Sequence, residues 1–273
     1  MSTIRQVKPS DFFARHPVFR YDEFVTAHAG LGGRSRQTSA SALKQHVAAG
    51  RLLHLRRGLY ATVPRGAAAE RHPIDPYLVA TQLAEDAGVA WHAALQFHGR
   101  AYSVWSRFHY LTRARQRRFV FRDLEFVPVQ APVSLRDRAD LGGGVAEHRH
   151  AGGVARVTTL ERTLVDVLDA PERCGGWEEV WRSLEMIEYF DLDAVLSYTR
   201  LLGSALTAAR VGFFLEQHRE SLMVETQHLV ALRELAPTQP RYLDSRREPG
   251  KLVKDWNLVV PERVLTRSWA EVR

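Results

Sequence analysis

The stretch from Ser39 to Tyr60, SASALKQHVAAGRLLHLRRGLY, decides the fold at the start of this chain. Leu43 and Val47 lie one helical turn apart, so their side chains share one face of a predicted helix. Thr38 or Ser39 can cap the start of that helix through a side-chain oxygen, and Gly50 can end it in the left-handed conformation. The stretch therefore predicts a short helix with one apolar face.

Two short apolar runs follow this helix and flank a tight basic turn. Residues 52–55 precede Arg56-Arg57-Gly58 and residues 59–63 follow it, which predicts a hairpin with a positive tip. Helices are also predicted upstream, at Pro9–His16 and Tyr21–His28. Phe24 and Val25 of the second one are expected to pack on the apolar face of the helix after Ser39. Helices followed by such a hairpin are the layout of a winged helix-turn-helix.

The positive charge of the chain is concentrated at its start. Residues 1–69 contain eleven Lys or Arg and three Asp or Glu, an excess of eight, whereas the remaining residues contain 27 basic and 28 acidic ones. No acid occurs between Glu23 and Glu70. Because a basic surface attracts phosphates, this segregation indicates nucleic-acid binding by the first quarter of the chain.

The outward face of the predicted helix carries small or hydrogen-bonding side chains, which suit a helix that enters the major groove of DNA. Cations precede it, follow it and form the hairpin tip, where they would meet phosphates beside the groove. The competing interpretation is a small helical module with ordinary surface cations. The residues expected to bind DNA are Arg34, Arg36, Ser39, Ser41, Lys44, Gln45, Arg51, Arg56, Arg57 and Tyr60.

The composition indicates a globular protein of a reducing compartment. The chain has 273 residues, of which 45% are hydrophobic, enough for two modest domains. Its single cysteine, Cys174, excludes an internal disulfide and a multi-cysteine zinc site. No apolar run reaches the length of a membrane span, and the first residues lack the apolar core of a secretion signal. We therefore expect a cytoplasmic protein without a cofactor, a bound metal or a membrane contact.

The chain is expected to form two domains of the α+β class. A winged helix-turn-helix would occupy residues 1–66, a connector without periodic pattern residues 67–74, and a mixed domain residues 75–273. We expect residues 70–273 to fold alone.

The mixed domain is predicted to begin with a sheet and to end with helices. Helices are expected at residues 75–86 and 91–98, strands within 103–132 and 145–157, and a helix from Thr158 or Thr159 to Leu168. Several helices follow. Residues 256–260 are expected to return to the sheet as a strand.

The mixed domain has a basic half and an acidic half. Seven Arg and no acid lie between Asp86 and Asp123, whereas Glu161 to Asp193 contains ten acids. Either the halves partly neutralise each other, or the basic half makes a second contact with nucleic acid or a partner. Aromatic residues interleave with its arginines, which favours the second hypothesis. The residues of this possible patch are Arg113, Arg115, Arg117, Arg118 and Arg122.

An enzyme is the remaining class to consider, and no complete catalytic set is found. Asp123 and Glu125 could hold a metal ion as in some nucleases, but Val127 stands where those nucleases have Lys. His148 and His150 could share a strand face, without a third ligand nearby. His92 and His98 do not share a helix face. A metal-dependent DNA-processing enzyme is therefore a distant alternative.

Four segments of the chain resemble the AbiEi-type antitoxins and related transcriptional regulators of bacterial abortive-infection and type IV toxin-antitoxin systems. The resemblance covers nearly the whole chain. The segments are GRLLHLRRGLY at 50–60, DPYLVATQLAEDAGVAWHAALQFHG at 75–99, VTTLERTLVDVLDAPERCGGWEEVWRSLE at 157–185 and GFFLEQHRE at 212–220. The second and third segments are more specific for this family than the first, which covers the predicted hairpin.

The resemblance implies a division of labour between the two domains. The winged helix would bind operator DNA and repress the antitoxin's own operon, and the second domain would counter a nucleotidyltransferase-like toxin without forming a stable complex with it. Relatives without a toxin also exist, so a stand-alone winged-helix regulator is the alternative.

Overall fold

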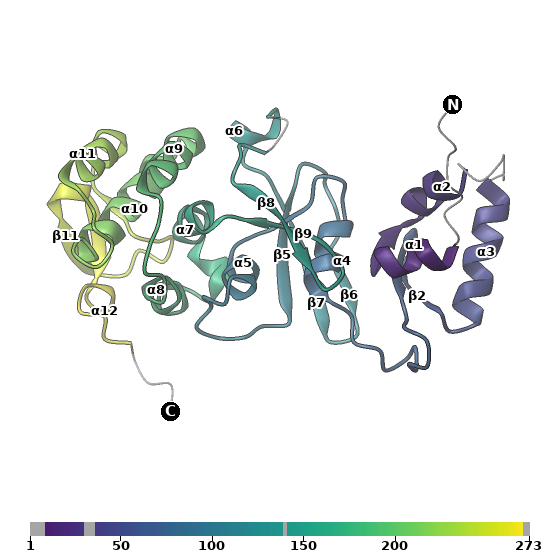
Figure 1. Ribbon diagram of the computed structural model, residues 1–273. Helices are drawn as coiled ribbons and strands as arrows, with labels where there is room; N and C mark the ends of the chain where they lie inside the picture. The colour runs from purple at the N-terminus through teal and green to yellow at the C-terminus, as the bar shows by residue number, and fades with distance from the viewer. Residues whose placement is uncertain (1–8, 30–35, 139–140, 270–273) are drawn as a thin grey trace.

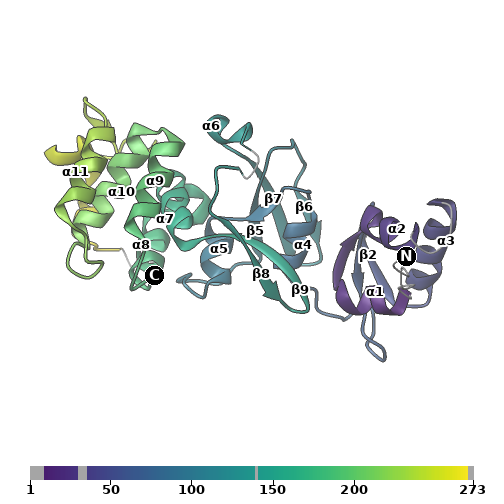
Figure 2. The same ribbon diagram turned by 45° about the horizontal axis from the view of Figure 1, so that its top comes forward.

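The chain forms an elongated molecule of mixed α and β structure (Figure 1). The computed structural model describes residues 9–29, 36–138 and 141–269. Helices and a small sheet form the N-terminal end, a larger sheet forms the centre, and a group of helices forms the opposite end (Figures 1 and 2). The predicted α+β class is confirmed.

The N-terminal unit comprises the described residues between 9 and 63. Its strands form an antiparallel sheet in the order β1-β3-β2. Phe19, Phe24 and Leu43 are fully buried and join the helices to this sheet, with Phe12 and Phe13 packed around them. The elements are α1 (Pro9–Arg15), β1 (Val18–Arg20), α2 (Tyr21–Ala29), α3 (Arg36–Ala48), β2 (Leu52–Arg56) and β3 (Leu59–Thr62).

The structure corrects the prediction for this unit at three points. Strand β1 was not predicted, because a run of three residues carries no periodicity of its own. Helix α3 begins at Arg36 rather than after a cap at Thr38 or Ser39, which lie inside it. Val25 is not part of the aromatic core, which Phe24 and Leu43 share.

The end of α3 is formed as predicted. Gly50 has a φ of +66°, the left-handed conformation that glycine adopts at low cost. The amides of Arg51 and Gly50 donate to the carbonyls of His46 and Val47, each at 3.0 Å. These two bonds form a Schellman motif, which turns the chain directly into β2.

Six strands form the central sheet within the described residues, in the order β6-β7-β5-β4-β9-β8. The pairs β7/β5 and β4/β9 are parallel and the other pairs are antiparallel. The strands are β4 (Gly88–Val89), β5 (Arg107–Thr112), β6 (Phe119–Phe121), β7 (Leu124–Gln130), β8 (Val145–His150) and β9 (Gly153–Thr158). Helices α4 (Pro76–Gln82), α5 (His92–Phe97) and α6 (Val133–Arg136) accompany this sheet.

The N-terminal unit and the central sheet share one hydrophobic cluster. Val18, Leu59 and Ala61 of the N-terminal sheet belong to the same cluster as Leu78 and Val79 of α4. All five side chains are at most 6% exposed. The connector therefore joins two units that are already packed against each other.

The C-terminal end is helical and carries a small sheet of its own. Strand β12 pairs with β10 and β11, so residues 256–260 do not return to the central sheet as predicted. Gly212 allows the ring of Trp256 to pack against α10, because an added Cβ would lie 2.1 Å from a ring carbon. The elements are α7 (Leu160–Asp169), η1 (Pro171–Cys174), α8 (Trp177–Glu185), α9 (Leu192–Leu202), α10 (Ala205–Gln217), α11 (Thr226–Leu235), β10 (Arg241–Tyr242), β11 (Gly250–Val253), η2 (Lys254–Trp256), β12 (Leu258–Pro261) and α12 (Glu262–Leu265).

Within the described part of the chain, none of the helices combines the length and the apolar character that crossing a membrane requires.

Candidate nucleic-acid interface

Helix α3 divides its side chains between the core and the solvent. Leu43 is 0% exposed and Ser39 is 1% exposed, and both point into the N-terminal unit. Ser41, Lys44 and Gln45 are exposed on the other side. The helix lies at the outer end of the molecule, away from the central sheet (Figure 1). The predicted outward face is therefore available to a ligand as large as a DNA duplex, except at Ser39, which is buried.

Three arginines were expected to bind DNA near the ends of α3. Arg34 lies outside the described residues. Arg36 is the first residue of α3. Arg51 follows the helix and is exposed. Arg51 therefore lies exposed between the end of α3 and the start of β2.

Tyr60 of β3 is less free than the sequence suggested. Its ring stacks on that of Phe19, with the ring centres 5.7 Å apart, and lies 5.3 Å from that of His54. Burial, with a smaller effect of Tyr21, raises the pKa of the Tyr60 hydroxyl. The ring packs against the aromatic core and the side chain is partly buried, so contact of Tyr60 with DNA stays a prediction.

The two arginines at the hairpin tip have different environments. Arg56 turns toward the central sheet, where its Nη2 donates to the carbonyl oxygen of Leu83 at 2.8 Å. Its guanidinium also lies over the ring of Phe119, 5.6 Å from the ring centre. Arg57 is exposed. The expectation that both contact phosphates is therefore corrected for Arg56, whose charged group is already bound within the protein.

The predicted second basic patch lies mostly on the loop between β5 and β6, residues 113–118, and three of its arginines are bound internally. Arg113 donates to the carbonyl of Arg138 at 2.5 Å, and Arg118 pairs with Glu125 at 3.0 Å. Arg122 donates to the carbonyls of His72 and Ala69 in the connector, at 2.7 and 3.1 Å.

Arg115 and Arg117 are the remaining members of that patch. Both are exposed. Neither makes a hydrogen bond or an ion pair with any residue that the structure describes. These two arginines are therefore exposed and, among the described residues, unpaired, whereas Arg118 and Arg122 are exposed but bound to other groups of the chain.

The side chains considered for metal-dependent chemistry are engaged in other contacts. Glu125 pairs with Arg107 at 2.6 Å and with Arg118, and the hydrogen bond from Arg107 lowers the pKa of this carboxyl group. Asp123 lies in the turn before β7 rather than on a strand beside Glu125. No group of three or more His, Cys, Asp or Glu side chains suited to a metal ion occurs in residues 9–29, 36–138 and 141–269.

The histidines noted in the sequence also have structural partners. His150 Nε2 lies 2.7 Å from Asp75, which caps α4 by accepting from the amides of Tyr77 and Leu78. His92 is fully buried, lies 3.0 Å from Glu179 and stacks on Trp105. These contacts position helices rather than forming an open site.

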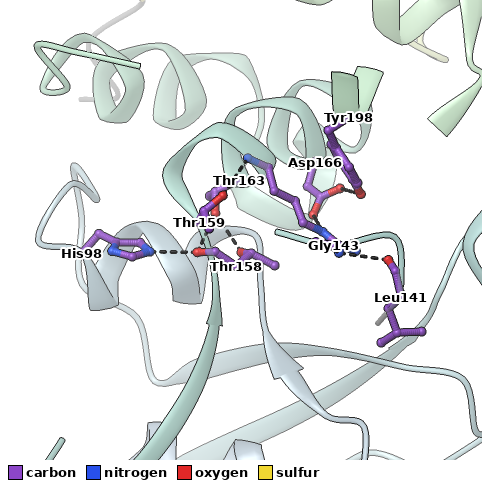
Figure 3. Close-up of polar contacts among 9 residues, drawn as sticks. His98, Leu141, Gly143, Thr158, Thr159, Thr163, Asp166 and Tyr198 are labelled. Atoms are coloured by element: carbon purple, nitrogen blue, oxygen red, sulfur yellow. Dashed lines mark hydrogen bonds and ion pairs between the residues drawn. The ribbon is translucent and has the colours of Figure 1, made fainter. Parts of the chain in front are cut away.

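The segment TLERTLVD, residues 159–166, forms a buried polar network where β9 runs into α7 (Figure 3). Thr159 caps α7 by accepting from the amide of Arg162, and the hydroxyls of Thr158 and Thr163 are 2.7 Å apart. His98 approaches the carbonyl of Thr158 at 2.8 Å. The network ties α5, β9 and α7 together.

Arg162 and Asp166 hold the other side of α7 in place. The guanidinium of Arg162, 1% exposed, donates to the carbonyls of Leu141 and Gly143 and to Asp166. Tyr198 of α9 donates its hydroxyl to Asp166 at 2.7 Å. Burial raises the pKa of the Asp166 carboxyl group, against the effect of Arg162. The pair is closed to solvent, so we assign it to the fold rather than to a binding site.

The comparisons with known proteins bear on the fold alone. No family model matches the chain, and no curated protein matches it. Among solved structures, the chain is similar to the crystal structure of the Rv2827c protein from Mycobacterium tuberculosis. The TM-score is 0.56 at 17% identity, over 93% of this chain and 90% of the other. At this identity the likeness extends to nearly the whole fold and not to function.

Proposed function

We propose that this protein is a sequence-specific DNA-binding transcriptional regulator, with α3 as its recognition helix. The observation that carries the proposal is the exposed face of α3, on which Ser41, Lys44 and Gln45 stand free at the outer end of the molecule. Lysine and glutamine can hydrogen-bond to base edges in a major groove. The competing explanation, a helical module with ordinary surface cations, does not account for the absence of acids between Glu23 and Glu70.

The order of elements supports a winged helix-turn-helix as the class of this unit. The order α1-β1-α2-α3-β2-β3 places a hairpin directly after α3, as the wing of such a domain. Arg51 and Arg57 are the exposed cations of the described hairpin and its approach. They would contact phosphates and so add affinity that depends on salt but not on base sequence.

We also propose that the protein is an antitoxin that represses its own operon and counters a nucleotidyltransferase-like toxin without a stable complex. The support for this part is the resemblance of the segments at 50–60, 75–99, 157–185 and 212–220 to AbiEi-type antitoxins. The toxin-countering role would fall to the central sheet and the C-terminal helices.

The test of DNA binding is a titration of the whole protein with its own upstream DNA and with a scrambled duplex, at two salt concentrations. Tight binding that prefers the upstream DNA and weakens with salt is expected. Equal and weak binding to both duplexes would overturn the proposal and reduce the N-terminal unit to a scaffold.

The test of the antitoxin role is co-expression with any nucleotidyltransferase-like protein encoded beside this chain. Growth is expected to be restored by the whole protein. Specific DNA binding without restored growth would favour a stand-alone regulator instead.

A further inference from the structure

The wing tip and the loop at 113–118 meet at the junction between the N-terminal unit and the central sheet. Arg56 of the wing and Gln116 of the loop both donate to the carbonyl oxygen of Leu83, at 2.8 and 3.2 Å. One acceptor atom thus brings together two segments that are far apart in the sequence. Arg57 is the chain neighbour of Arg56, and Arg115 and Arg117 are the neighbours of Gln116.

The cations at this junction divide into bound and free ones. Arg56, Arg113 and Arg118 are bound to protein oxygens, as described above. Arg57, Arg115 and Arg117 are exposed, and none of them is paired with any residue that the structure describes. The bound arginines hold the hairpin tip and the loop at 113–118 in place. The exposed arginines belong to the same two segments.

The acids near the junction keep their negative charge but are fewer than its arginines. Asp86 accepts from the hydroxyl of Thr112 at 2.7 Å and from the amide of Arg113 at 2.8 Å. Glu125 pairs with Arg107 and Arg118. Glu85 is exposed and lines, with Asp86, an open pocket of about 740 Å³ beside Gln116. Asp22 also lies near, because it lines a pocket with Arg57. The junction still carries an excess of positive charge, because Arg56, Arg57, Arg113, Arg115, Arg117 and Arg118 outnumber these four acids.

We infer that Arg57, Arg115 and Arg117 form one phosphate-binding strip across the junction, and that its ligand is the backbone of the DNA whose groove α3 enters. This inference rests on the proposed function and deepens it. DNA binding would then extend from the N-terminal unit onto the central sheet. The strip is indifferent to base sequence, because guanidinium groups on phosphates carry affinity and register but not base preference.

The test compares two double variants of the whole protein with the same change of charge. Arg115→Gln/Arg117→Gln removes two cations of the strip. Arg246→Gln/Arg247→Gln removes two exposed cations just before β11, at the opposite end of the molecule (Figure 1). Each variant is titrated with the upstream duplex and the scrambled duplex over a series of salt concentrations, and its folding is checked by thermal unfolding.

The strip variant is expected to lower the slope of log affinity against log salt by about two units, because about one unit is lost for each phosphate contact. Its preference for the upstream duplex should be unchanged, since α3 is intact. Arg115→Lys/Arg117→Lys should restore the slope. A strip variant that matches the control, or a Lys variant that restores nothing, would overturn the inference and leave the DNA-binding proposal standing. Salt-insensitive binding by the unaltered protein would overturn both.

Discussion

At the scale of single residues, Lys44 and Gln45 are the side chains on which base preference is expected to depend. Replacing either with Ala should reduce the difference in binding free energy between upstream and scrambled DNA by about 1–3 kcal/mol, if the side chain bonds to a base edge. Lys251→Ala, on the exposed strand β11, is the control. Equal losses on both duplexes would show that the two residues contact only phosphates.

His109 of β5 makes the stability of the fold depend on pH. Burial, with the charges of Arg173 and Arg107, lowers the pKa of this imidazole from 6.5 to about 4. Between these two values the unfolded chain binds a proton that the folded chain does not bind, so stability falls as pH falls from 6.5 to about 4. Once the pH is below both pKa values, the free energy of unfolding is expected to have fallen by about 3 kcal/mol.

Chemical denaturation of His109→Gln across that range measures this dependence. The variant should lose the part of the pH slope that His109 contributes. His54→Gln, at an exposed position, should keep it. An unchanged slope in the first variant would mean that His109 titrates normally in the folded protein.

At the scale of elements, the hairpin is expected to separate two roles between neighbouring arginines. Arg56→Gln removes a charged hydrogen bond and a cation–π contact with the central sheet, and should lower the free energy of unfolding by about 1–3 kcal/mol. Arg57→Gln should change stability by less than about 0.5 kcal/mol and lower the salt slope of DNA binding by about one unit. The reverse pattern would contradict the assignment.

Helix α7 depends on a buried ion pair, and its loss should be costly. Arg162→Leu leaves the carboxyl group of Asp166 buried with Tyr198 as its remaining side-chain donor, so a loss of about 3–5 kcal/mol is expected in denaturant unfolding. The double variant Arg162→Leu/Asp166→Leu should be less destabilised than the Arg162→Leu variant, because it leaves no unpaired carboxyl group buried. Additive losses would mean that the two side chains do not act as a pair.

At the scale of the whole molecule, the shared hydrophobic cluster argues against two independent domains. A fragment of residues 70–273 would expose part of the cluster that Leu78 and Val79 share with Val18 and Leu59 in the whole chain. We expect this fragment to unfold at a lower temperature than the whole protein and to self-associate in size-exclusion chromatography. A monomeric fragment with unchanged thermal stability would support the two-domain interpretation of the sequence instead.

The likeness to the Rv2827c protein fits this view of one continuous architecture. It extends over 93% of this chain and 90% of the other. A chance match of one common module would cover much less. The arrangement of the units, and not only each unit, is therefore shared between the two proteins.

The sequence by itself determined the features that depend on near neighbours in the chain. Leu43 and Val47 predicted the buried face of α3, Gly50 its end, and Arg56 to Gly58 the hairpin turn, because helical period and turn chemistry are local properties. The absence of acids between Glu23 and Glu70 follows directly from the composition of that segment.

The tertiary structure alone decided which of the predicted site residues are free. Ser39 and Tyr60 are packed in the N-terminal unit, and Arg56 is bound to Leu83, whereas Arg57 and Arg115 remain exposed. A residue type states that a side chain is charged, but not whether an oxygen from a distant part of the chain already binds it. That depends on long-range packing, which also added β1 to the N-terminal sheet and paired the predicted strand β12 with β10 and β11 rather than with the central sheet.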